Sequence, residues 1–166
     1  MLKNHQLVVP FEMVKKILKI VVLVLVAVFI ILQFFQIDKS LPVTDESQTL
    51  EATTDVPPDI GMILTTSCGD CHTNKTTYPW YSYIQPSGWF LNDHVQDGRR
   101  HLNFSIWNTY DVKKKRKKLE EVCDEVKAGS MPLPSYLWIH GDAVLTESQA
   151  KALCSWANAE RDRLKE

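Results

Sequence analysis

Cys68-Gly69-Asp70-Cys71-His72 places two cysteines one helical turn apart and a histidine directly after the second. This C-x-x-C-H spacing is typical of c-type haem attachment, in which each thiol adds to one vinyl group of the same porphyrin. The imidazole that follows then reaches the iron from the same side. The motif predicts one covalently bound haem c per chain, held through Cys68 and Cys71, with His72 as the proximal iron ligand.

Three other interpretations of these residues stay open. A zinc site would combine the motif with Cys123 and Cys154, although these two do not form a second C-x-x-C. A thioredoxin-like redox pair needs a strand that leads into a helix, and the flanking sequence shows no such strand. The spacing can also occur by chance in a domain that contains disulfides. Features elsewhere in the chain favour haem.

The N-terminal part of the chain is predicted to be a membrane anchor. Every residue from Ile20 to Leu32 is apolar, lysines precede this run and acidic residues follow it. We therefore expect residues 1–16 in the cytoplasm, a transmembrane signal anchor over 17–37, and export of the remainder. No small-x-small cleavage site follows the run, so the anchor is expected to stay uncleaved. This predicts a single-pass protein of the inner membrane with its haem domain in the periplasm, where bacteria attach c-type haem.

Two further parts follow the anchor. Residues 38–58 are rich in Ser, Thr, Pro and acidic side chains and are predicted to form a flexible, solvated tether. Residues 59–166 are long enough for one small domain, which a covalent porphyrin would help to stabilise. Basic and acidic side chains balance in this domain, and the whole chain has a formal net charge of −1, so nothing indicates nucleic-acid binding.

The domain is predicted to be all-α, with a few short helices and long loops around the haem. One helix is expected over 59–68, with Asp59 able to cap it, and another from 88 to about 101 after the N-cap Ser87. A third should follow Asp111 and end at Gly129. The last begins at Thr146, whose spacing to Gln149 is that of a capping box.

Met131 is the predicted distal ligand of the iron. It stands between Gly129 and two prolines, Pro132 and Pro134, which hold the backbone stiffly. His/Met ligation is a known haem arrangement that raises the reduction potential. The alternatives are Met131 as core filler, an open sixth position, or a histidine ligand. The candidate histidines are His94, His101 and His140.

Other residues are assigned to the surroundings of the haem. The aromatic loop that contains Trp80 is expected to cover the porphyrin face on the His72 side, with Trp89 nearby, although an ordinary aromatic mini-core is the alternative. Arg99 is a candidate donor to a haem propionate, against a solvated surface role. The basic run 113–118 is expected to be a solvated helix face, or else a docking site for an acidic redox partner.

Cys123 and Cys154 lie on two separate predicted helices. In an exported domain they can form a disulfide, and two separately buried thiols are the alternative.

The sequence as a whole resembles the small haem-binding domain family of membrane-anchored, cytochrome c-like proteins, frequent in Bacteroidetes-type bacteria. The resemblance covers about residues 57–159. It implies covalent haem c on Cys68, Cys71 and His72, with Met131 in the position of the expected distal ligand. The Cys123 and Cys154 pair is an addition to the family pattern. Besides the C-x-x-C-H motif, the matching residues are Tyr78-Pro79-Trp80-Tyr81, Pro86, Trp89, Gly98-Arg99, Leu102-Asn103-Phe104-Ser105, Trp107, Met131-Pro132, Tyr136, His140, Leu145-Thr146 and Trp156.

The sequence favours a membrane-tethered monohaem cytochrome that transfers single electrons to or from an unidentified redox partner, and not an enzyme. An iron with both axial positions filled does not readily bind substrate. The alternative is a haem-based gas or redox sensor with a labile or open distal position. A peroxidase-like enzyme is a third reading, and it would need a distal base such as His94 or His140.

Overall fold

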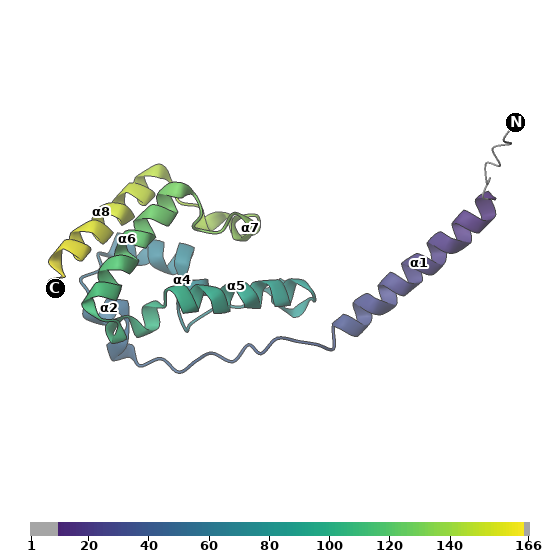
Figure 1. Ribbon diagram of the computed structural model, residues 1–166, viewed down its shortest axis with the longest axis horizontal. Helices are drawn as coiled ribbons and strands as arrows, with labels where there is room; N and C mark the ends of the chain where they lie inside the picture. Colours follow the sequence, from purple (N-terminus) through teal and green to yellow (C-terminus); the bar gives the residue numbers. More distant parts are fainter. Residues whose placement is uncertain (1–9, 165–166) are drawn as a thin grey trace, which may run out of the picture.

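The computed structural model describes residues 10–164, and these form helices, helical turns and loops without any strand (Figure 1). The predicted all-α class is therefore confirmed. Of the predicted cytoplasmic segment 1–16, residues 1–9 lie outside the described part of the chain.

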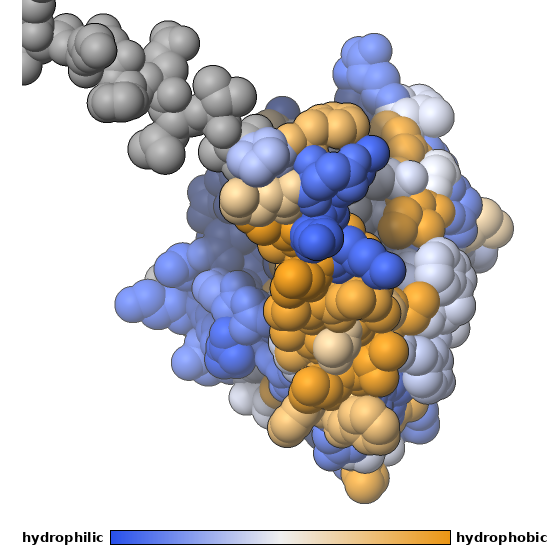
Figure 2. Space-filling view, turned by 90° about the vertical axis from the view of Figure 1, so that its right-hand side faces the viewer, coloured by the Kyte–Doolittle hydropathy of each residue, from blue (hydrophilic) through white to orange (hydrophobic). Residues whose placement is uncertain are grey.

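Helix α1 (Phe11–Leu32) has no buried residue and leads away from the other helices (Figure 1). From Ile20 to Ile31 its large apolar side chains are between 47 and 62 % exposed. Figure 2 shows them gathered in front of the domain, below the hydrophilic residues beside the grey segment. The helix ends at Leu32, so the last residues of the predicted span 17–37 are not helical. Among the helices of residues 10–164, none is both long and apolar enough to cross a membrane.

The segment predicted as a flexible tether packs on the domain instead. It contains the short helices η1 (Glu46–Gln48) and α2 (Leu50–Thr53) and runs back beneath α5 (Figure 1). Leu50 is only 1 % exposed and belongs to the main core cluster. The polar composition of 38–58 predicts that the segment cannot fold alone, and the buried Leu50 anchors it to a core that other elements form.

Three consecutive elements form one helical run that carries the C-x-x-C-H motif. They are α3 (Pro58–Ile63), the π-helical turn η2 (Leu64–Cys68) and α4 (Gly69–His72). The predicted helix over 59–68 is present, but it begins at Pro58 with Pro57 as N-cap and no side-chain cap from Asp59. A π-turn widens the helix locally and is often found at functional sites.

Helix α5 (Ser87–His101) follows the short 3-10 helix η3 (Trp80–Tyr83). Ser87 is the first helical residue and not the N-cap, and its hydroxyl donates to the carbonyl oxygens of Tyr81 and Ile84. The 3-10 helix η4 (Phe104–Thr109) comes next and leads into the C-terminal half.

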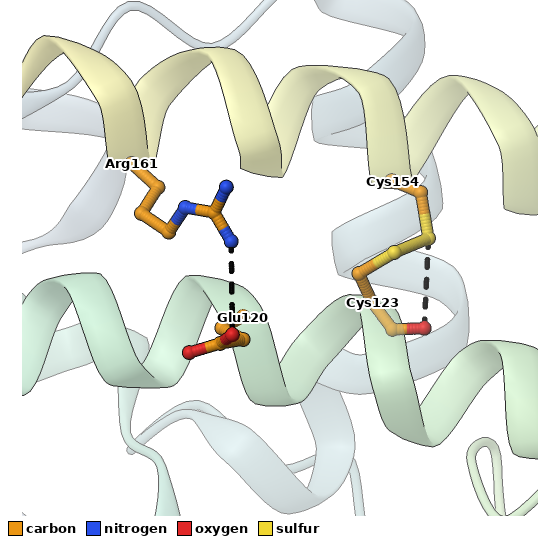
Figure 3. Close-up of a disulfide and its surroundings, with 4 residues drawn as sticks. All are labelled: Glu120, Cys123, Cys154 and Arg161. Carbon is orange, nitrogen blue, oxygen red and sulfur yellow. Dashed lines mark hydrogen bonds and ion pairs between the residues drawn. A yellow bond between two sulfur atoms is a disulfide. The ribbon is translucent and has the colours of Figure 1, made fainter.

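Helices α6 (Val112–Ala128) and α8 (Glu147–Arg163) lie side by side (Figure 1). Asp111 caps α6 through the Lys114 amide, Gly129 ends it at φ 71°, and the predicted capping box opens α8. The structure joins Cys123 of α6 to Cys154 of α8 in a disulfide (Figure 3). The short helices α7 (Pro134–Leu137) and η5 (Gly141–Ala143) connect them.

One hydrophobic core holds the domain together beside the motif. It joins residues 58–68 to η4, α6 and α8. The C-x-x-C-H motif therefore directly follows a helical segment that is packed in the core. The core residues are Leu50, Ile60, Ile63, Leu64, Leu102, Phe104, Trp107, Tyr110, Leu119, Leu153 and Ala157.

Candidate functional site

Cys68, Cys71 and His72 line the same cavity, which opens to solvent and has a volume of about 240 Å³. That volume lies just below the ~300–1,000 Å³ typical of ligand sites. Two adjoining hollows share walls with it, and we call the three together the central cleft. The residues that line at least two of these hollows are Cys68, Cys71, His72, His94, Asp97, His101, Met131, Leu133 and Tyr136.

The two motif cysteines are free thiols. Burial raises the pKa of Cys68 to about 12, with a smaller contribution from Cys71. Burial likewise raises the pKa of Cys71 to about 11, helped by the Asp70 carboxylate. Both side chains are therefore protonated near neutral pH, whereas cysteines in redox pairs and metal sites have a lowered pKa. Within residues 10–164, no group of three or more His, Cys, Asp and Glu side chains is placed to hold a metal ion.

The His72 ring is fixed by the backbone of α5 and the residue after it. Its Nδ1 lies 3.1 Å from the Gly98 carbonyl oxygen and 2.9 Å from that of Leu102. Both partners are acceptors, so Nδ1 carries the proton and Nε2 keeps its lone pair. Burial lowers the pKa of His72 despite these two bonds, which keeps the ring neutral. A neutral ring whose other nitrogen donates to a carbonyl is typical of a metal-ligating histidine.

Gly98 allows α5 to approach the motif closely. A Cβ at position 98 would lie 2.8 Å from the carbonyl oxygen of Cys71 and 3.1 Å from its Cβ. Only a residue without a side chain lets the Gly98 carbonyl reach His72 while α4 and α5 stay in contact.

Met131 lines the cleft together with His72 in two of the three hollows. The chain turns sharply at Gly129, where the left-handed φ of 71° suits glycine. The amides of Ser130 and Met131 then donate to the Glu125 carbonyl oxygen at 3.0 and 3.2 Å. The end of α6 thus fixes the backbone that presents the thioether.

Two of the three candidate histidines also line the cleft. His94 and His101 project from α5, and the Nδ1 of each lies within hydrogen-bonding distance of the carbonyl four residues earlier. His140 lies outside the cleft-lining set, stacked on Tyr136 at 4.0 Å with its Nε2 2.9 Å from the Tyr81 hydroxyl.

The three residues predicted to surround the haem do not line the central cleft. Arg99 donates from Nε to the Thr73 carbonyl and from Nη2 to the Thr76 hydroxyl, so it fixes the loop after the motif. Trp80 is 69 % exposed, and the Trp89 indole donates to the Phe35 carbonyl. None of the three is among the residues that line the described cavities. The hydrogen-bond partners of Arg99 and Trp89 are distant in sequence, so local sequence patterns do not reveal them.

Sequence reasoning assigned no individual role in the site to three residues, Asp70, Lys118 and Tyr136. The Tyr136 hydroxyl donates to Asp70, inside the motif, at 2.8 Å, and burial raises the pKa of Tyr136. The Asp70 carboxylate also accepts from the Thr77 amide at 3.0 Å. Lys118 lines the cleft beside His72, with its side chain only 13 % exposed and paired with Glu121. The local sequence offers a signal for Asp70, which lies inside the motif, and for Lys118, which ends the basic run 113–118.

The donor set of the cleft fits a covalently bound haem. It offers two thiols one turn apart, a neutral imidazole with a free Nε2, and a thioether along the same cavity. Cys123 and Cys154 are joined in a disulfide, so neither is available as a ligand for the alternative four-cysteine zinc site.

A family model described as a haem-binding domain matches residues 27–159 of the chain. The match begins within α1 and includes the segment 38–58, in agreement with the packing of that segment on the domain. No curated protein and no solved structure matches the chain.

Proposed function

Because the chain belongs to the haem-binding domain family, we propose that it is a membrane-tethered monohaem c-type cytochrome that transfers single electrons outside the cytoplasm. The observation that carries the proposal is the geometry of His72. Its Nδ1 is committed to two backbone carbonyls while Nε2 stays free, on a helix that also presents Cys68 and Cys71 to the same cavity.

Each residue of the set has a distinct role in this proposal. Cys68 and Cys71 would hold the porphyrin through thioether bonds, and His72 and Met131 would be the ligands of its iron. When bound, the haem iron supplies one-electron redox chemistry. The chain contributes fixed axial ligands, because the backbone of α5 holds His72 and the end of α6 holds Met131.

Electron transfer fits this cleft better than substrate turnover. With His72 and Met131 both bound to the iron, no position on it would be left for a substrate, and the cavity opens to solvent, where a partner could approach. Lys118 lines the cleft with its side chain 13 % exposed, and we propose it as the partner of a porphyrin propionate in place of Arg99.

Helix α1 is the proposed membrane attachment. Its uninterrupted apolar run carries exposed side chains that water does not favour, and Lys15, Lys16 and Lys19 precede that run. The disulfide between α6 and α8 supports an oxidising compartment for the domain.

The first experiment tests covalent attachment. The full chain is expressed in a host that matures c-type cytochromes, and its mass and Soret absorption are measured after denaturation and acid–organic extraction. We expect one porphyrin per chain that resists extraction. The Cys68→Ala/Cys71→Ala variant should lose it, and the matched Cys123→Ser/Cys154→Ser variant should keep it. A wild-type mass without porphyrin would end the proposal.

The second experiment separates a carrier from a ligand-binding module. The ferric spectrum of wild type should show a methionine–iron charge-transfer band that disappears in Met131→Ala. The ferrous wild type should not bind CO, whereas the variant should. A ferrous wild type that binds CO readily would favour a gas sensor, with an open or labile distal position. An unchanged spectrum in Met131→Ala would transfer the distal role to His94 or His101, which share the cleft.

A further inference from the structure

The end of α1 is joined directly to the domain by a set of hydrogen bonds. Gln33 makes two of them to the backbone of Gln85, its Oε1 accepting from the amide at 2.9 Å and its Nε2 donating to the carbonyl at 3.0 Å. Gln36 donates to the Tyr83 carbonyl at 3.3 Å, and the Trp89 indole donates to Phe35 at 2.8 Å. Gln85 itself is wholly buried. We call these contacts the glutamine clamp.

The same end of the domain exposes large aromatic and apolar side chains. They come from η3, the first turn of α5, and the stretch that includes and follows α7. One hollow of the central cleft opens at this end and is lined by Phe90, Trp138 and Ile139 together with Tyr81. Tyr81 packs edge-on against Trp80 at 5.8 Å, so the outer rim of that hollow and the three segments form one surface. We call it the aromatic end. Its exposed members are Trp80 at 69 %, Tyr83 at 58 %, Phe90 at 57 %, Trp138 at 84 % and Ile139 at 60 %.

Charge is absent from the sequence segments that build this surface. Residues 78–92 contain no Lys, Arg, Asp or Glu, and neither do residues 131–141. The apolar run of α1 and the residues after it, 20–37, are equally uncharged. Three uncharged stretches, far apart in sequence, therefore meet where α1 joins the domain, and α1 leads away from that end (Figure 1).

We propose that the aromatic end is a second membrane contact, which lies in the interfacial layer of the same bilayer that α1 enters. This inference rests on the proposed role of α1 as the membrane attachment. Trp and Tyr favour the membrane–water interface because each combines an apolar ring with a polar group. The glutamine clamp supplies the geometry, because it holds the aromatic end at the point where α1 leaves the domain.

The experiment uses the full, haem-loaded chain in vesicles of phosphatidylethanolamine and phosphatidylglycerol. Single spin labels are attached at Tyr83→Cys, Trp138→Cys, Val24→Cys in α1 and Lys151→Cys in α8. Lys151 serves as the solvent control because its side chain is 74 % exposed. We expect the ratio of oxygen to aqueous-nickel accessibility at positions 83 and 138 to exceed that at 151 several-fold.

The label at position 24 separates the two ideas. If the label at position 24 is immersed while positions 83 and 138 have the same accessibility ratio as position 151, α1 is the membrane attachment but the aromatic end does not contact the membrane. If position 24 is itself in water, the anchoring part of the proposed function fails first. Dipolar broadening between labels at position 138 would identify the surface as a contact between two copies and would also overturn the proposal.

A clamp variant gives a further measurement. Gln33→Ala removes both hydrogen bonds to Gln85 but leaves the aromatic side chains in place. We expect immersion at position 138 to fall while that at position 24 stays unchanged. Immersion at 138 that is insensitive to Gln33→Ala would show that the clamp does not orient the domain.

Discussion

Single residues set the chemistry of the cleft through contacts that the motif alone does not reveal. The spacing Cys68-x-x-Cys71-His72 predicts which side chains share the cavity, and the structure brings all three to it. It does not reveal that the carbonyl oxygens of Gly98 and Leu102 fix the tautomer of His72, because both residues are 26 or more positions away in the sequence. For the same reason the role of Arg99 could not be read locally.

Gly98→Ala tests the close contact between α4 and α5. The added methyl group would meet Cys71 at 2.8 Å, so we expect a loss of ~1–3 kcal/mol in unfolding free energy and a shifted Soret band. Urea unfolding and absorption spectra measure the two effects. The control is Gly61→Ala, where the nearest atom, on Val56, is 3.8 Å away. Equal losses in both variants would contradict the proposed packing.

Alkaline pH should destabilise the fold through its buried phenols. Burial raises the pKa of Tyr110 above 10.0, although a hydrogen bond from the Asn103 amide acts in the opposite direction. Since the folded pKa exceeds the unfolded one, the stabilisation is complete below pH 10.0 and is lost as pH rises through the folded pKa. Tyr81 and Tyr136 shift in the same direction.

Tyr110→Phe should therefore flatten the fall of unfolding free energy above about pH 10. It should also cost ~1 kcal/mol at neutral pH through the lost hydrogen bond to Asn103. Urea titrations at a series of pH values measure both effects, and Tyr83→Phe, at an exposed position, is the control. If the unfolding free energy fell equally above pH ~10 in wild type and Tyr110→Phe, the loss of stability would be due to the other tyrosines.

Among the elements, helices with local stop signals were predictable and the segment 38–58 was not. Asp111, Gly129 and the Thr146–Gln149 box lie within a turn of the ends that they define, so sequence alone locates α6 and α8. The packing of α2 depends on Leu50, whose core partners come from distant elements. A single buried leucine hardly changes the average composition of the segment, so composition did not reveal the packing of Leu50.

Leu50→Ala tests whether α2 belongs to the core. Truncation of a leucine that is 1 % exposed should cost ~2–5 kcal/mol of unfolding free energy. Val43→Ala, in the same segment but at a residue 94 % exposed, should leave stability within ~0.5 kcal/mol of wild type. Urea unfolding of both variants measures the two effects. If Leu50→Ala left the unfolding free energy unchanged, the original prediction of a flexible tether would be supported instead.

The basic run of α6 is largely occupied by contacts within the domain. Lys114 lies over the Tyr110 ring at 3.8 Å, and Arg116 donates to the carbonyls of Arg161 and Leu164 at the end of α8. Lys117 and Lys118 pair with Glu121. These contacts favour a structural role for the run over the docking of an acidic partner.

For the whole molecule, the C-terminal half is held by links between α6 and α8. The Cys123–Cys154 disulfide closes a separation of 31 residues, and Arg161 lies 3.9 Å from Glu120 in the same interface (Figure 3). That segment also carries Met131, so the bridge bounds the part of the chain that presents the proposed distal ligand.

Cys123→Ser/Cys154→Ser should lower the unfolding free energy by ~2–4 kcal/mol, because the bridge restricts the unfolded chain. Haem content should stay at the wild-type value, since both cysteines lie outside the cleft-lining set. Denaturant titration and haem absorbance of the same samples measure the two quantities. Loss of haem from a folded variant would place the bridge within the cofactor site.

The glutamine clamp has a consequence for how such a protein can work. Many carriers ferry electrons by swinging or diffusing between a donor and an acceptor. If the chain is the proposed membrane-bound carrier, a domain secured at Gln33 and Gln36 could not swing relative to α1, so it would act as a relay at one height above the lipid. Its donor and its acceptor would then both have to come to that height, and the residues that hold the domain would limit which molecules could reach the haem.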